Sequence, residues 1–260
     1  GCGEFPQEGA PSRLLTGIAP AARLHVYKVL DDDGMGRDAW IIKALDHVAR
    51  TNERAGRPRI AGVNLSLGGS GATDNGTGSS MMLETMRILR QTYPNPRRTI
   101  VIALWGGEEQ GLNGSRRFVA MHPEIVDGVQ AVFNQDNGTG RVQNISMSGF
   151  VDAGAAFGSW FARLPSQLSG QINLQLPGTP GTGGTDHVSF VCAGAPAFNL
   201  SALGWDYGTS TWHTNRDTFD KVVFEDLKNN VVLVTMLAYL AAEEPELMPR
   251  DRRVLPMNQN

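Results

Sequence analysis

Hydrophobic and polar residues follow helix-like and strand-like spacings in turn along the chain. Four segments are predicted helices, most of them with apolar residues recurring every three or four positions: residues 38–50, 80–93, 153–164 and 224–243. Five shorter apolar runs are predicted strands: residues 23–30, 60–67, 98–105, 128–134 and 141–150. Alternating strands and helices predict an α/β fold, a three-layer α/β/α sandwich with a mostly parallel or mixed central sheet.

Two of these elements carry detailed expectations. In the second helix, the residues expected to face the core lie at steps of four, three and four: Met82, Met86, Leu89 and Tyr93. The run 98–105 is almost continuously apolar, which is typical of a strand buried on both faces of a sheet. Residues 128–134 are its expected neighbour.

Length and composition indicate one large domain, residues 1–260, because 41% of the residues are hydrophobic and can form a sizeable core. Lys and Arg number 23 against 26 Asp and Glu, with no long run of one sign, so nucleic acid is not an expected partner. The longest apolar stretch, residues 231–242, is well short of the roughly 20 residues that cross a bilayer, and no membrane span is predicted. Cys2 and Cys192 leave the presence of a disulfide open. The oligomeric state has no signal in the sequence.

Acidic residues stand where predicted strands end or helices begin: Asp74, Glu108, Glu109 and Asp136. In an open α/β sheet, ligands gather outside the carboxyl ends of the strands, so these carboxylates are expected to converge. Carboxylates in one crevice repel one another unless a divalent cation offsets the repulsion, and an imidazole, here His213, favours zinc. Taken singly, Asp74 and Asp136 would indicate ordinary turns, since each precedes Asn-Gly. Taken together, the series predicts a zinc site.

Five motifs occur in order along the chain: DNGTG, WGGEEQGLNGS, a strand ending in Asp, GGTDHVSF and WHTNRDT. Their order and spacing resemble the zinc aminopeptidase and glutamate carboxypeptidase family, metallopeptidase family twenty-eight. The resemblance implies a zinc-exopeptidase-like fold over about residues 72–246. It also implies a metal-dependent exopeptidase, most simply an aminopeptidase, that acts on peptide or aminoacyl substrates and is secreted or periplasmic.

The same resemblance implies a role for each residue of the acidic series. Asp74 would bridge two metal ions, with Glu109 and His213 completing the ligands of one ion. Asp136 would serve the other ion, so the expected cofactor is one or two zinc ions. Glu108 would be the general base, because a carboxylate beside a metal-activated water can take its proton and pass it to the leaving amine.

The motif GGTDHVSF supplies two further candidates, Asp186 and His187. They match positions that line the family's site. We expect them on the substrate side of the site or behind the metal ligands rather than among the ligands. His47 and His122 are interpreted as structural.

One expected ligand is missing from the family pattern. The family normally supplies a further histidine, in an H-x-D motif on the strand before the bridging acid. The equivalent strand here reads AGVNLSLGG, with Asn64 and Ser66 at the corresponding places. His25 is an alternative source of the imidazole, although a structural role is the simpler interpretation. A second hypothesis is therefore a catalytically weak or inactive metallopeptidase-like scaffold or binding protein.

The N-terminal part resembles a different family. Residues 17–69 are similar to an internal βαβ piece of subtilisin-like serine proteases, but they lack the D-[ST]-G and H-G-T signatures of the catalytic Asp and His. The sequence thus predicts a chimeric chain with a seam near Ser70, in which this segment contributes to the sheet as scaffold. Gly208-Thr209-Ser210 matches the nucleophile motif superficially, but no partner motif accompanies it, so Ser210 is not expected to be catalytic.

Overall fold

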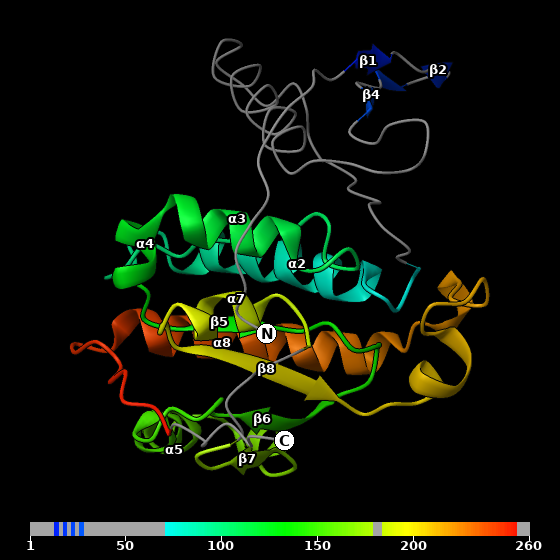
Figure 1. The fold of residues 1–260 in the computed structure, drawn as a ribbon. Helices are drawn as coiled ribbons and strands as arrows, with labels where there is room; N and C mark the ends of the chain where they lie inside the picture. Colours follow the sequence, from blue (N-terminus) through cyan, green and yellow to red (C-terminus); the bar gives the residue numbers. More distant parts are fainter. Residues whose placement is uncertain are drawn as a thin grey trace, which may run out of the picture.

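The computed structural model describes residues 71–178 and 184–253 (Figure 1). It also describes the backbone of four short strands nearer the N-terminus, which pair as two antiparallel hairpin-like ladders, β1 with β4 and β2 with β3: β1 Arg13–Leu15, β2 Ile18–Ala19, β3 Ala22–Arg23 and β4 Val26–Lys28. The predicted helix 38–50 and the predicted strand 60–67 lie outside the described residues.

The main described sheet has four strands in the order β5, β8, β6, β7. Their bounds are β5 Val132–Asn134, β6 Val142–Ser146, β7 Asn173–Gln175 and β8 Ala197–Ala202. β5 runs parallel to β8, β8 runs antiparallel to β6, and β6 runs parallel to β7. The sheet is therefore open and mixed, as the sequence predicts.

Helices pack against this sheet and against one another. The described helices are α2 Gly76–Thr92, α3 Asn113–Met121, α4 Pro123–Asp127, α5 Ala153–Phe161, α6 Ser166–Ser169, α7 His187–Cys192 and α8 Phe224–Glu243, with a π-helix, η1 Tyr207–Thr211, and a 3₁₀ turn, η2 Phe219–Lys221. α2 packs on α8, and α7 contacts α3, β5 and β8. In Figure 1, α2 and α3 lie above the strands. The architecture is the predicted α/β class. None of the described helices combines the length and apolar character needed to span a lipid bilayer.

An aromatic cluster in the core joins α5 to the sheet. The ring of Phe157 on α5 lies 4.8 Å from that of Phe198 on β8 and 5.0 Å from that of Trp160, measured between centroids. Phe150 also packs edge-on against Phe198. All four side chains are completely buried. Because large buried aromatic rings contribute much of a core's stability, this cluster fixes β8, and β5 beside it, in place.

Helix α2 begins before the predicted segment because its first turn has a side-chain cap. The Oδ1 atom of Asn75 accepts a hydrogen bond of 3.0 Å from the backbone N–H of Gly78. Such a cap satisfies one of the N–H groups that a helix start leaves unpaired. The Nδ2 atom of Asn75 also donates to the carbonyl of Gln135, at 3.0 Å. One side chain therefore ties the start of α2 to the segment that follows β5.

The buried face of α2 differs from the predicted one: Met81 and Thr85 are buried where Met82 and Met86 were predicted, a shift of one position. The buried residues are Thr77, Gly78, Met81, Thr85 and Leu89, so of the four predicted residues only Leu89 is among them. Met82 and Met86 are half-buried at its border. The sequence places two methionines side by side, so spacing alone fits either face equally well, and packing on α8 decides between them.

The predicted strand at residues 98–105 is also wrong for the part of the chain that the structure describes. These residues form no ladder with any described strand, and Val101 is 71% exposed. The expected neighbour, β5, pairs with β8 instead. An apolar run becomes a strand only where a second strand supplies hydrogen-bond partners, and local composition does not indicate whether one is present.

Asn230 connects α8 to the start of β6. Its side chain is completely buried; Oδ1 accepts from the N–H of Val142 at 2.9 Å, and Nδ2 donates to the carbonyl of Gly140 at 2.8 Å. Both backbone groups depend on this amide because no water reaches a fully buried side chain of this kind.

We expect Asn230→Ala to lower the free energy of unfolding by about 1–3 kcal/mol, because it leaves buried polar groups without partners. Urea unfolding followed by circular dichroism measures the change. Val232→Ala is the matched control on the same helix: Val232 is 45% exposed, and a surface substitution of this kind changes stability by less than about 0.5 kcal/mol. Equal losses in the two variants would contradict the role given to Asn230.

Candidate metal centre

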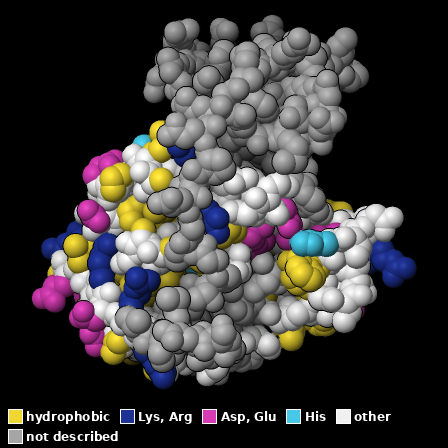
Figure 2. Space-filling model, viewed as in Figure 1, with side chains coloured by type: hydrophobic (Ala, Val, Ile, Leu, Met, Phe, Trp, Pro, Cys, Tyr) yellow, Lys and Arg dark blue, Asp and Glu magenta, His cyan; other side chains and the backbone are white. Residues whose placement is uncertain are grey.

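The predicted site residues come from four separate loops. Asp74 lies in the turn that leads into α2, and Glu108 and Glu109 lie in the loop before α3. Asp136 follows β5, and His213 follows η1. Figure 2 shows acidic side chains gathered beside a histidine in a hollow of the surface. The expected convergence is therefore present, although among these acids only Asp136 follows a described strand.

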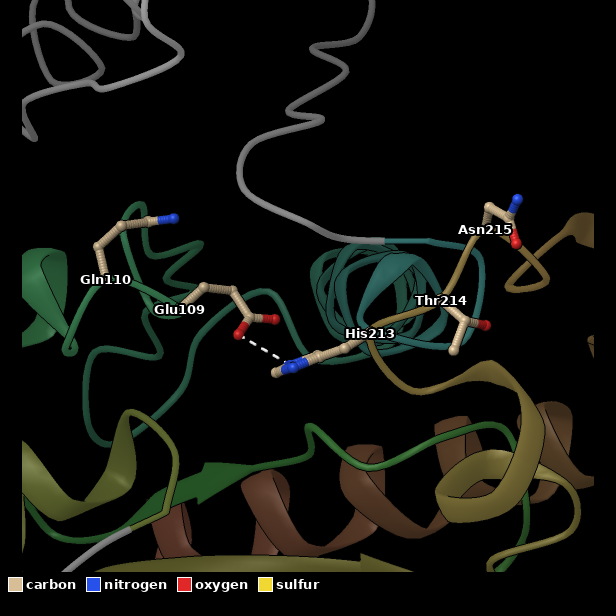
Figure 3. A pocket seen from close by; sticks show the side chains of 5 residues that line it. All are labelled: Glu109, Gln110, His213, Thr214 and Asn215. Carbon is tan, nitrogen blue, oxygen red and sulfur yellow. Dashed lines mark ion pairs between the residues drawn. The ribbon is translucent and has the colours of Figure 1, made fainter.

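Three of these side chains meet closely enough to hold one metal ion. The Nε2 atom of His213 lies 2.9 Å from Oε2 of Glu109 and 3.6 Å from Oδ2 of Asp74. One ligand atom from each of the three residues lies within 4.8 Å of the others. Figure 3 shows Glu109 and His213 pointing toward each other across a pocket of about 480 Å³. Within residues 71–178 and 184–253, this is the one group of three or more His, Cys, Asp or Glu side chains arranged in this way.

Local structure fixes the direction of the His213 side chain. The residue has a left-handed backbone, with φ of 56°, which is uncommon outside glycine and turns the chain sharply after η1. The indole of Trp212 lies against the imidazole, with 4.3 Å between the ring centroids. The ring is thereby supported on one side.

Two carboxylate oxygens at the site are buried without a hydrogen-bond partner. Oδ2 of Asp74 faces His213, and Oδ1 of Asp136 is the second. The other oxygen of Asp136 accepts a hydrogen bond of 2.6 Å from the hydroxyl of Thr185. Buried acceptors are normally paired, and a cation is a partner that satisfies several at once. The oxygen of Asp74, together with a carboxylate oxygen of Glu109 and the imidazole nitrogen of His213, forms a ligand set that fits zinc.

The crowded carboxylates hold their protons more tightly than isolated ones. Burial, followed by the charges of Asp136 and Glu109, raises the pKa of Asp74 to about 6. Burial and the charges of four neighbouring acids raise the pKa of Glu108 to about 8. Burial also raises the pKa of Asp136. Glu108 is not part of the three-residue group, yet the negative charge of each of these acids contributes to its raised pKa.

Asp186 and His187 stand at the start of α7, both buried. The charge of Asp186 contributes to the raised pKa of Glu108, which places Asp186 on the Glu108 side of the site. Burial lowers the pKa of His187 to about 4, so its imidazole is neutral at pH 7. Neither residue belongs to the three-residue group, and their roles stay predictions.

His25, the alternative source of the missing imidazole, lies outside the residues whose side chains the structure describes, as do Asn64 and Ser66, which stand in place of the H-x-D motif. Ser210 lies within η1, and its carbonyl accepts a hydrogen bond from the hydroxyl of Thr214. Cys192, at the end of α7, is disulfide-bonded.

Sequence reasoning missed three residues that hold the site together. The hydroxyl of Tyr207 lies close enough to Asp74 to lower the pKa of its carboxyl group, and Thr185 orients Asp136. The carboxylate of Asp217 binds the backbone of the loop that carries Asp74. Thr185 and Asp217 lie inside the motifs GGTDHVSF and WHTNRDT, which was a usable signal, whereas Tyr207 had none.

The chain is similar to proteins that are described as peptidases. The chain is 27% identical over 186 residues to carboxypeptidase Q of Xenopus laevis, a match that covers 70% of this chain and 37% of that protein. The chain thus spans little more than a third of the length of this curated relative.

Solved structures show the same fold. A peptidase M28 precursor from Shewanella amazonensis has a TM-score of 0.60 at 25% identity, covering 70% of this chain and 40% of that one. BSAP, a zinc aminopeptidase from Bacillus subtilis, has a TM-score of 0.50 at 27% identity, covering 65% of this chain and 42% of that one.

The family comparison covers both the described site and part of the N-terminal segment. The model of peptidase family M28 matches residues 44–238, and so includes part of residues 17–69, whose subtilisin-like origin stays a prediction. The match contains every loop that contributes to the metal centre and extends over three quarters of the sequence. The chain belongs to peptidase family M28.

Proposed function

We propose that the chain is a zinc-dependent exopeptidase, most simply an aminopeptidase acting on peptide or aminoacyl substrates. The observation that carries the proposal is the meeting of Asp74, Glu109 and His213 beside Glu108, a carboxyl group with a strongly raised pKa. The likeness to a protein described as a zinc aminopeptidase supports the choice of metal and reaction.

In this proposal, Asp74, Glu109 and His213 hold a zinc ion. When bound, zinc supplies Lewis acidity: it polarises a substrate carbonyl and makes water a stronger nucleophile near neutral pH. Asp136 lies near enough to raise the pKa of Asp74 and is the carboxylate available to a second ion.

Glu108 moves the proton. Its carboxylate takes a proton from the attacking water as the oxygen bonds to the carbonyl carbon, and returns it to the amine nitrogen as the carbon–nitrogen bond breaks. A buried carboxylate surrounded by other acids binds a proton more strongly than one in water, and this makes it a better base.

The alternative function is a weak or inactive metallopeptidase-like scaffold. One observation favours it: among the described residues, only one three-residue ligand group forms, and Asp136 is not in it. Together with the absent H-x-D histidine, this suggests that one ion binds well and that a second ion lacks a complete set of ligands.

Glu108→Gln tests the catalytic assignment. We expect hydrolysis of an aminoacyl anilide to fall by about 10²–10⁴-fold, because the amide cannot accept the proton, while zinc stays bound. Glu124→Gln is the control, because Glu124 is an exposed acid of α4 that contacts only His122 among the ion pairs of the described chain. Unchanged hydrolysis by the Glu108 variant would remove this residue as the base.

Zinc stoichiometry separates one metal position from two. After metal stripping and refilling, native mass spectrometry is expected to find one tightly held zinc ion per chain, bound by the three-residue group. Two tightly held ions would show that a residue outside the described parts completes the second position. A chain that takes up no zinc would favour the inert scaffold.

Stability of the metal-free protein is expected to fall as pH rises. The folded-state pKa values of Asp74 and Glu108, about 6 and about 8, lie above their ordinary values of 3.8 and 4.5. Between the ordinary and the raised pKa, the folded state binds more protons than the unfolded state. The free energy of unfolding therefore decreases with pH across this window.

Melting temperatures of EDTA-treated and zinc-loaded protein, measured from about pH 5 to about pH 8.5, check this slope. Zinc should remove most of the loss, because the cation offsets the repulsion that deprotonation creates. Glu108→Gln should flatten the upper part of the metal-free curve. A metal-free melting temperature that rises between about pH 6 and about pH 8 would contradict the assignment.

A further inference from the structure

Asp217 binds three consecutive backbone N–H groups of the loop that carries Asp74. Its Oδ1 accepts from the N–H of Thr73 and its Oδ2 from the N–H of Asp74, both at 2.8 Å. Its own carbonyl accepts from the N–H of Ala72 at 3.1 Å. Asp217 is only 9% exposed and follows His213 by four positions. Asp217, which lies in the same segment as His213, thus holds the loop that carries Asp74 by hydrogen bonds.

The contact between the two segments is closely fitted. A Cβ atom at Gly71 would lie 2.4 Å from the side chain of Asp217, so only glycine allows this approach without displacing it. The hydroxyl of Thr73 also hydrogen-bonds that of Thr211, at 3.1 Å. The carboxylate is therefore held against the loop by packing as well as by hydrogen bonds.

Hydrogen bonds to a carboxylate are about twice as strong as those between neutral groups, so this contact is suited to resist movement of the loop. Both oxygens of Asp217 are used on the backbone of Thr73 and Asp74. The Asp74 side chain is left to face His213, with Oδ2 at 3.6 Å from Nε2. The arrangement sets the distance between two sides of the site that come from distant parts of the chain.

We propose that Asp217 is a positioning residue for the metal centre: by clamping the loop of Asp74 to the segment of His213, it preorganises the two sides for one ion. The inference rests on the proposed function in that the centre binds zinc. It assigns to Asp217 no contact with metal or substrate.

Asp217→Asn is the direct test. The amide keeps one acceptor oxygen but places an NH₂ group against the second backbone donor, so one hydrogen bond is lost. We expect the zinc affinity, measured by competition with a chelator, to fall by about 10–100-fold, the usual cost of losing a group that orients a metal ligand. The visible spectrum of the cobalt-substituted protein should change as well, because it reports ligand geometry.

Asp226→Asn is the matched control. Asp226 is also buried, 7% exposed, but it pairs with Arg141 and with the indole N–H of Trp205, and it contributes to none of the site hydrogen bonds described above. We expect this variant to lose stability while its zinc affinity and cobalt spectrum stay at the parent values.

Gly71→Ala tests the same contact from the other side, and it removes no charge. The new Cβ would push the Asp217 carboxylate off the loop, so zinc affinity should again fall and the cobalt spectrum should shift. Gly158→Ala, on α5, is its control, because a Cβ there meets nothing within 4 Å. This pair keeps the test decisive if Asp217→Asn fails to fold.

The outcomes distinguish the inference from the proposed function. A parent protein that binds zinc while both Asp217→Asn and Gly71→Ala bind it equally tightly, with unchanged cobalt spectra, would overturn the positioning role alone. A parent protein that binds no zinc would overturn the proposed function and the positioning role with it. Loss of affinity in both variants and in neither control supports the inference.

Discussion

The constraint on which the rest of the structure depends is the crowding of carboxylates in one partly buried hollow. Burial and mutual repulsion raise the pKa values of Asp74, Glu108 and Asp136 together, so each ionised group costs stability in the absence of a cation. The buried aromatic cluster around Phe198 opposes that cost, as do the hydrogen bonds from Asp217 to the loop that carries Asp74. In the metal-free state the ionised carboxylates repel one another, and a divalent ion bound among them would replace this repulsion by attraction.

Much of the site could be predicted from the sequence because its chemistry is local. Acids and a histidine in recognisable motifs identify Asp74, Glu109 and His213, and the structure brings these three together. The bounds of α8 were also predicted correctly, since a long apolar helix without competing turns has one interpretation. The α/β architecture brings together, at one edge of the sheet, residues that are far apart in the sequence.

What could not be predicted depends on partners that spacing does not reveal. The motif WHTNRDT marks the neighbourhood of Asp217, but spacing does not reveal that this carboxylate accepts hydrogen bonds from the backbone of Thr73 and Asp74. The hydroxyl of Tyr207 reaches Asp74 only because η1 folds it there. Likewise, residues 98–105 have a strand's composition without a described strand beside them, and composition alone cannot supply the missing hydrogen-bond ladder.

The two hydrogen bonds of the Asn75 side chain, one accepted from the first turn of α2 and one donated to the carbonyl of Gln135, have a mechanical consequence. Asn75 is the neighbour of Asp74, and Gln135 is the neighbour of Asp136, so both carboxylates are attached through one residue to the same helix end. Helices ordinarily fray from their ends on heating. Fraying of the first turn of α2 would break these two hydrogen bonds, so the order of this helix end and the separation of the two carboxylates are coupled.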